Sequence, residues 1–162
     1  MIAPRRSLLV LILIALTWPA RAPAQVGEVF TAPVTRVADG DTITVARAGD
    51  AVRIRLDGID TPETNQPFGR EATAFLSARV LQQHVTVTVK DVDRYGRFVS
   101  RVSVGGEDLS LALVAAGLAW HYVRYSDDAA IARAEADART KQIGLWVQSA
   151  PVAPWEFRRQ SR

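Results

Sequence analysis

Alternation of apolar and polar residues is the feature that most constrains the fold of this chain. Between residues 42 and 57, apolar side chains occupy every second position of two runs, Ile43 and Val45, then Val52, Ile54 and Leu56. The same period of two returns in residues 85–89 and 98–104. Because half-buried antiparallel strands require this alternation, we predict a sheet of about five strands.

Helical patterns interrupt and follow these runs. Apolar residues recur at near-helical spacing over residues 68–80, which predicts an amphipathic helix between the third and fourth strands. A short apolar helix is expected over residues 108–116, and a third from near Ser126 to about residue 142 with Asp127 and Asp128 in its first turn. Short strands with an inserted helix predict an α+β fold, a five-stranded barrel of the oligonucleotide-binding (OB) type with about three helices.

The first 24 residues have the pattern of a secretory signal peptide. Arg5 and Arg6 precede an apolar run over residues 8–16, and small residues before Gln25 predict cleavage there. The run is shorter than the roughly 20 residues of a membrane-spanning helix, so we expect a secreted or periplasmic protein without stable membrane association after cleavage. A chain that kept this segment would be an envelope-associated scaffold instead.

Removal of the signal also changes the charge balance. The chain has 20 basic and 17 acidic residues, but three of the arginines and none of the acids lie in residues 1–24, which leaves 17 of each. Attraction to an anionic partner would then depend on a local arginine cluster. We expect residues 25–148 to form one domain, monomeric in solution, and residues 149–162 to form a flexible tail containing prolines and arginines.

Two acidic motifs are the first candidates for chemistry. Asp39-Gly40-Asp41-Thr42 precedes one predicted strand, and residues 60–64, Asp-Thr-Pro-Glu-Thr, follow a strand expected to be its neighbour. Strand pairing would bring both motifs to one end of the sheet. The chain has no cysteine and neither motif has a histidine nearby, so these oxygen ligands favour a hard cation such as Ca²⁺. Each motif alone is equally typical of a simple turn.

Two arginines complete a recognisable pattern with these motifs. Arg55 lies on the polar face of its strand, and Arg97 follows Tyr95-Gly96 at the start of another. With them the chain resembles the staphylococcal-nuclease-like thermonucleases. The matching strings are residues 39–42, residues 55–64 and residues 93–97, in that order, and the resemblance covers about residues 31–147.

The resemblance implies a role for each matching position. Asp41 and Asp60 would bind Ca²⁺ through their carboxylates, and Thr61 through its backbone carbonyl. Arg55 and Arg97 would grip the phosphate and neutralise charge in the transition state. The implied activity is calcium-dependent hydrolysis of phosphodiester bonds in DNA, with RNA as a second candidate substrate, at low sequence specificity and with 3′-phosphate ends.

The resemblance also makes Glu63 the general base of the reaction. A phosphodiester is anionic and repels hydroxide, so a site that hydrolyses it must neutralise charge and accept a proton from water. Glu63 would either take that proton or position the water. The connection from Glu63 to the first helix, residues 65–69, is shorter than the long mobile loop of the best-known family member, which leaves substrate preference and the mobility of Glu63 open.

Tyrosines near the second helix are candidates for stacking on a nucleobase. The family covers its bound nucleotide with tyrosines in this region, where the chain has Tyr122 and Tyr125, and the resemblance does not decide which of them stacks. Tyr95 is a candidate to flank the phosphate site, and a simple strand-end role is the alternative. Core packing is the commoner use of such residues.

The alternative to an enzyme is a non-catalytic OB module that binds nucleic acid or protein. Degenerate domains of the family lose the acidic ligands or the arginines, whereas this chain retains all five positions.

Overall fold

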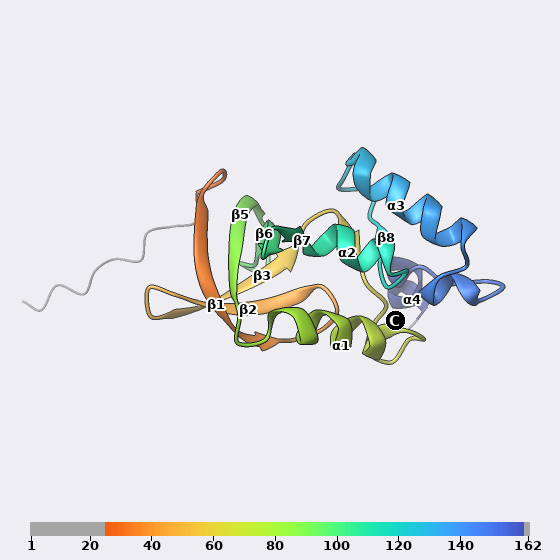
Figure 1. Ribbon diagram of the computed structural model, residues 1–162, viewed down its shortest axis with the longest axis horizontal. Helices are drawn as coiled ribbons and strands as arrows, with labels where there is room; N and C mark the ends of the chain where they lie inside the picture. The colour runs from red at the N-terminus through yellow and green to blue at the C-terminus, as the bar shows by residue number, and fades with distance from the viewer. Residues whose placement is uncertain (1–24, 161–162) are drawn as a thin grey trace, which may run out of the picture.

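Residues 25–160 are described by a computed structural model, shown in Figure 1. The predicted signal peptide, residues 1–24, therefore lies outside the described residues. Between residues 25 and 160, no helix has both the length and the apolar composition needed to cross a membrane.

A closed β-barrel forms the first half of the fold. Its strands are β1 (Val29–Val37), β2 (Thr42–Arg47), β3 (Asp50–Leu56), β5 (His84–Val92) and β6 (Phe98–Val104). Neighbours pair antiparallel in the order β3-β2-β1-β5-β6, and a parallel pairing of β3 with β6 closes the barrel. The predicted α+β class with a five-stranded OB-type barrel is confirmed. The parallel closing pair was not expected, because alternation within a strand does not reveal which strand closes the sheet.

Shorter strands connect the barrel to the second half of the chain. β4 (Ile59–Asp60) pairs antiparallel with β8 (Trp120–His121), so that Asp60 lies opposite Trp120. β7 (Glu107–Asp108) pairs with the end of β6. The β4–β8 pair ties the predicted acidic segment to residues that lie sixty positions later.

Helices gather against the barrel and at one end of it (Figure 1). The three predicted helices are α1 (Gly69–Val80), α2 (Leu109–Ala115) and α3 (Ala129–Thr140). Helix α3 begins three residues later than predicted, because Asp128 is its N-cap and accepts hydrogen bonds from the backbone N–H groups of Ala130 and Ile131. A 3-10 turn, η1 (Gly144–Val147), follows α3.

A fourth helix, α4 (Pro154–Gln160), lies in the segment for which the sequence predicts a flexible tail. Proline is well suited to the first position of a helix, and both Ala153 and Pro154 are buried. A seven-residue helix is too short to form by itself in water, so packing must stabilise it. Such packing leaves little periodic signal in the sequence, which explains why the helix was missed.

The apolar interior has two parts. The larger lies inside the barrel and extends under α1 and α2, with Ile43, Ile54 and Leu113 fully buried. The smaller cluster is centred on Trp120 and Trp146, whose rings meet edge to face with centroids 4.5 Å apart. The rings of the smaller cluster support the C-terminal segment.

Candidate active site

The two predicted metal ligands, Asp41 and Asp60, lie at the same end of the barrel. Asp41 immediately precedes β2, and its carbonyl accepts a hydrogen bond of 2.8 Å from the N–H of Leu56 on β3. Asp60 is the second residue of the short strand β4, which begins three residues after the end of β3. Asp41 is 2% exposed and Asp60 0% exposed. Two buried carboxylates this close in the fold must be compensated by strong donors or a cation.

Thr61 links the two acidic motifs. Its backbone N–H and its hydroxyl both donate to Oδ2 of Asp41, each at 2.9 Å. Gly40 permits this approach, because a Cβ at that position would lie 2.7 Å from Oγ1 of Thr61 and 2.8 Å from Cβ of Ala72. The glycine of the Asp39-Gly40-Asp41 motif is therefore required by close packing as well as by the turn.

Arg55 bridges the two aspartates from β3. Its guanidinium donates to Oδ1 of Asp60 at 2.6 Å and to the carbonyl of Ile59 at 3.2 Å, and it forms an ion pair with Asp41. The side chain is largely buried in this position. Arginine suits the role because its planar fork presents several donors at fixed geometry.

Glu63 lies in the loop between β4 and α1. Its backbone N–H donates to Oε1 of Gln66 at 3.1 Å, and its carbonyl accepts from the N–H of Gln66 at 2.8 Å. Helix α1 starts directly against this loop, because a Cβ on Gly69 would lie 1.9 Å from the carbonyl oxygen of Glu63. The Glu63 side chain remains 38% exposed, so its carboxylate is accessible to water.

Arg158 of α4 is a site residue that the sequence did not indicate. Its guanidinium donates to Oδ2 of Asp60 at 2.7 Å and to Oε1 of Glu63 at 2.7 Å. Burial alone would lower the pKa of Arg158, but hydrogen bonds to Asp60 and Glu63 outweigh it and raise the pKa above its ordinary value. Only its position four residues after Pro154, within a proline-initiated helix, could have drawn notice, since no motif includes it.

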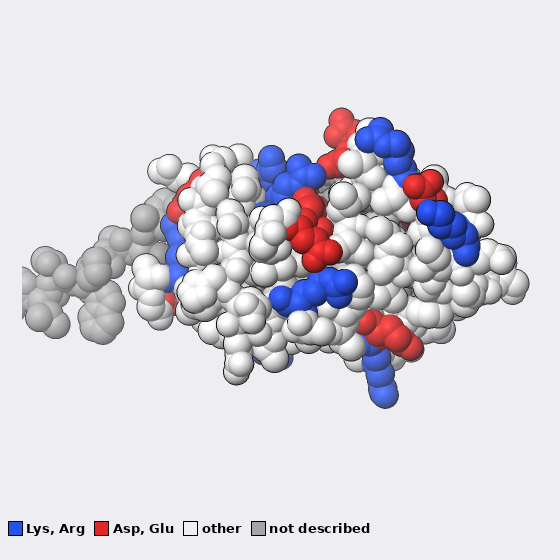
Figure 2. Space-filling model, viewed as in Figure 1, with Lys and Arg blue, Asp and Glu red and all other residues white. Residues whose placement is uncertain are grey.

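These side chains enclose a small pocket of about 30 Å³, the volume of one or two water molecules. Its lining is Asp39, Asp41, Arg55, Asp60, Thr61, Pro62, Glu63 and Arg158. Four carboxylates thus face two guanidinium groups, which leaves excess negative charge. Figure 2 shows one face of the molecule, on which acidic and basic side chains are interspersed over mostly uncharged surface.

The chemistry of the pocket fits a hard divalent cation. Among residues 25–160, no three His, Cys, Asp or Glu side chains form a ready-made metal cluster. A cation would be held by the buried carboxylates of Asp41 and Asp60, with Thr61 able to add its carbonyl oxygen. Carboxylate, carbonyl and water oxygens are the ligands that hard divalent cations such as Ca²⁺ and Mg²⁺ take in proteins.

Arg97 does not line this pocket and is held elsewhere. It donates to Asp93 through Nε at 2.7 Å and through its backbone N–H at 3.0 Å. Burial would raise the pKa of Asp93, but the hydrogen bonds from Arg97 and Tyr95 outweigh it and lower the pKa. Arg97 directly precedes β6, whose first residue Phe98 pairs with Ile54 on β3, the strand that carries Arg55.

The three candidate tyrosines lie in different settings. Tyr95 and Tyr125 are exposed, and Arg94 donates to the Tyr95 hydroxyl at 2.7 Å. Tyr122 packs face to face against Trp155 of α4, with centroids 5.0 Å apart and planes at 2°. Stacking on a substrate therefore stays a prediction for Tyr122 and Tyr125, of which Tyr122 already has an aromatic partner, and a place beside the phosphate stays a prediction for Tyr95.

The chain was compared with known proteins. The family model described as "Staphylococcal nuclease homologue" matches residues 53–148. A protein of Escherichia coli O157:H7 named "Uncharacterized endonuclease" is 38% identical over 154 residues, which cover 94% of this chain and 97% of the relative.

Two further relatives have similar coverage. An "Uncharacterized endonuclease" of Haemophilus influenzae is 37% identical over 136 residues, 83% of this chain and 76% of the relative. A "Micrococcal nuclease" of Shigella flexneri is 38% identical over 144 residues, 82% and 83% of the two chains.

Proposed function

The chain belongs to the family of staphylococcal nuclease homologues, and from that premise we propose that it is an exported, calcium-dependent nuclease of low sequence specificity. Nuclease activity accords with the names of its relatives, endonuclease and micrococcal nuclease. The observation that carries the proposal is the meeting of Asp41, Arg55, Asp60 and Glu63 around one pocket. From their spacing in the sequence, these four residues could belong to separate turns. In the folded chain they lie around one pocket.

The reaction that this pocket suits is hydrolysis of a phosphodiester bond. Glu63, exposed at the rim, accepts a proton from the attacking water or holds the water in line with phosphorus. The water oxygen bonds to phosphorus, the bond to the 5′-oxygen breaks, and that oxygen takes up a proton from solvent water and leaves as a 5′-hydroxyl. The phosphate then remains on the 3′ side.

Charge neutralisation falls to the arginines and to the cation. Arg55 is positioned to donate to a phosphate oxygen next to Asp60, and Arg97 would have to leave Asp93 to contribute from the neighbouring strand. When bound by Asp41 and Asp60, Ca²⁺ supplies positive charge against the anionic phosphate. Contacts of this kind are made to the phosphate backbone of the nucleic acid and not to its bases, which accounts for the low sequence specificity proposed.

Cleavage assays in three ionic conditions test the proposal. The purified protein is incubated with denatured DNA and with RNA in calcium, in magnesium and in chelator, beside Glu63→Gln and Arg97→Ala. We expect cleavage in calcium, loss in chelator, and end analysis that finds 3′-phosphates. Undiminished cleavage in chelator would refute the calcium mechanism, and inactivity of the unmutated protein would leave the non-catalytic binding module as the better interpretation.

Export is proposed from residues 1–24 alone. Arg5 and Arg6 before an apolar run and small residues before Gln25 support a cleaved signal. Mass spectrometry of the protein recovered outside the cytoplasm tests it. An N-terminus at Gln25 is expected, whereas a retained residue 1 would favour an envelope-associated protein.

A further inference from the structure

The C-terminal segment, residues 149–160, reaches the pocket although it lies beyond the matched family region. The family model ends at residue 148, whereas Arg158 lines the pocket together with Asp41 and Asp60. The segment therefore adds a charged group to a site whose other members come from residues 39–63.

The first connection is the ion pair between Arg158 and Glu63. One guanidinium nitrogen donates to Oε1 of Glu63 at 2.7 Å, and the other donates to Oδ2 of Asp60 at 2.7 Å. Among residues 25–160, Arg158 is the hydrogen-bond donor to the Glu63 carboxylate. Because Asp60 is fully buried and fixed by Arg55, Arg158 links the Glu63 side chain to the rigid end of the barrel.

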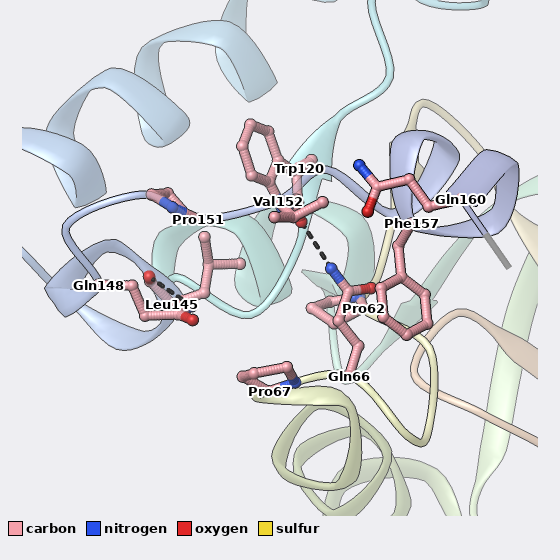
Figure 3. Close-up of a pocket in the computed structure, with 10 residues that line it drawn as sticks. All are labelled: Pro62, Gln66, Pro67, Trp120, Leu145, Gln148, Pro151, Val152, Phe157 and Gln160. Carbon is pink, nitrogen blue, oxygen red and sulfur yellow. Dashed lines mark hydrogen bonds between the residues drawn. The ribbon is translucent and has the colours of Figure 1, made fainter.

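The second connection holds the backbone of the same loop. Gln66 accepts from the N–H of Glu63 through Oε1, and its Nε2 donates to the carbonyl of Val152 at 2.6 Å. Figure 3 shows this amide pointing at Val152 from the wall of a cavity of about 230 Å³, with Phe157 beside it. Gln66 is buried, so water competes weakly for these bonds.

The segment that makes both connections is itself anchored. Trp155 stacks on Tyr122 at 5.0 Å and meets Trp120 edge to face at 5.7 Å, and Ala153 is buried in the smaller apolar cluster. Trp155 and Arg158 are three positions apart on one helix, so the position of the ring restricts where the guanidinium can reach. Ordering the long arginine side chain therefore costs less than it would on a free tail.

We propose that residues 149–160 are a positioning element of the active site, in which Arg158 and the Gln66–Val152 bond hold Glu63 in its working orientation. The inference rests on the proposed nuclease function. Its opposite is a plug, in which Arg158 occupies Asp60 and Glu63 and must leave before reaction. The two differ in sign, since loss of a positioning residue slows cleavage and loss of a plug accelerates it.

Steady-state kinetics on denatured DNA in calcium decide between them. For Arg158→Gln we expect kcat to fall by about 10², the loss typical of a misplaced catalytic group, with KM changed less than threefold. Arg158→Lys should recover part of the rate, because it keeps the charge without the fork. The matched control is Arg159→Gln, the next residue, which is 74% exposed and pairs with Glu156, and its kinetics should equal those of the unmutated protein. An unchanged or higher kcat for Arg158→Gln overturns the proposal.

A double-mutant cycle tests whether Arg158 acts through Glu63. In a Glu63→Gln background, Arg158→Gln should cause little further loss, because the group it orients has already gone. Calorimetric titration with calcium should show affinity that is equal or tighter in Arg158→Gln, since Asp60 loses a competing cation. Full additivity, or calcium affinity that falls together with kcat, would make Arg158 a general structural residue and overturn the proposal.

Hydrogen exchange separates this inference from the nuclease function itself. In Arg158→Gln, and in Gln66→Leu as a second variant, the backbone amides of residues 63 and 66 should exchange faster, while the barrel amides keep their exchange rates. In the control variant Arg159→Gln, all of these exchange rates should equal those of the unmutated protein. Unaltered exchange in that loop overturns the positioning element. An inactive unmutated protein with the expected exchange pattern would refute the function and leave the structural link standing.

Discussion

The carboxylates of the site are held in two different ways. Asp41 and Asp60 are 2% and 0% exposed and receive hydrogen bonds from Thr61, Thr42 and Arg55, all close to the barrel end, and Asp60 also accepts from Arg158. Glu63 is 38% exposed, and its carboxylate is held by Arg158, 95 residues further along the chain.

This difference matches two different tasks. A metal ligand works best when it is rigid and dry, because fixed oxygens lose little freedom when the cation binds. A general base must meet water and a substrate, so it lies at the rim, where the barrel gives it less support. The C-terminal segment, residues 149–160, can hold the Glu63 side chain where the barrel does not. If so, changes near the barrel end and changes near Glu63 should affect different properties of the protein.

The largest effect is expected at Arg55, within the barrel-held region. Arg55→Lys keeps the charge but loses the fork that reaches Asp60 and Asp41, and kcat/KM should fall by about 10² to 10³. Steady-state cleavage of denatured DNA measures it. Arg53→Lys, two residues earlier on the same strand and exposed, is the matched control and should change little. Equal activity in both variants would remove Arg55 from the site.

Gly69→Ala should affect the Glu63 loop and spare the metal ligands. The new Cβ would lie 1.9 Å from the Glu63 carbonyl oxygen, so the backbone of the loop must move, and kcat should fall by about 10². Calcium affinity, measured by calorimetry, should stay within about threefold.

Gly40→Ala is the matched variant for the other region. Its Cβ would press on Thr61 and Ala72, so calcium affinity should weaken about tenfold, equivalent to about 1.4 kcal/mol. If both glycine variants changed calcium affinity alike, the two regions would not be held independently.

Calcium should stabilise the protein through the barrel-held pair. At a hundredfold excess over Kd, a ligand of the native state adds about 2.7 kcal/mol, which corresponds to a rise in Tm of about 10 °C for a domain of this size. Scanning calorimetry with and without calcium measures the shift. Asp60→Asn should abolish it, whereas Glu63→Gln should retain most of it. Equal melting temperatures of the unmutated protein in both conditions would count against metal binding at this site.

The smallest effect is expected far from the pocket, at the N-cap of α3. Asp128→Ala removes the hydrogen bonds to the N–H groups of Ala130 and Ile131 and should cost about 1 kcal/mol of unfolding free energy. Denaturant unfolding measures the loss, and kcat should not change. A large change in kcat would show that the second half of the chain is coupled to the site more widely than through residues 149–160.

Much of the fold, and the approach of Asp41 to Asp60, could be predicted from the sequence because the signals are local. Alternation identified four of the five barrel strands, β2, β3, β5 and β6, but gave no run for β1, and the helical spacing over residues 68–80 identified α1. Asp41 and Asp60 flank neighbouring strands, so pairing alone brings them together, and the family-like strings at residues 39–42 and 55–64 carry that arrangement.

Other features depend on contacts between distant residues, and no local pattern records them. The parallel pairing of β3 with β6 closes the barrel, and the stacking of Trp155 on Tyr122 fixes α4 in a segment that was expected to be a flexible tail. The ion pair of Arg97 with Asp93 is local, because the two residues are four positions apart, but the motif indicates a phosphate ligand for Arg97 and not this partner.

The sequence by itself thus determined the class of fold, the family and the acidic motifs, because short-range periodicity and spacing encode them. Only the tertiary structure decided what surrounds Glu63. Its carboxylate meets an arginine that lies 95 residues away, and such a contact exists only after the smaller apolar cluster has anchored the C-terminal helix. Charge and helix propensity give Arg158 a place on the helix, but packing alone determines which carboxylates it faces.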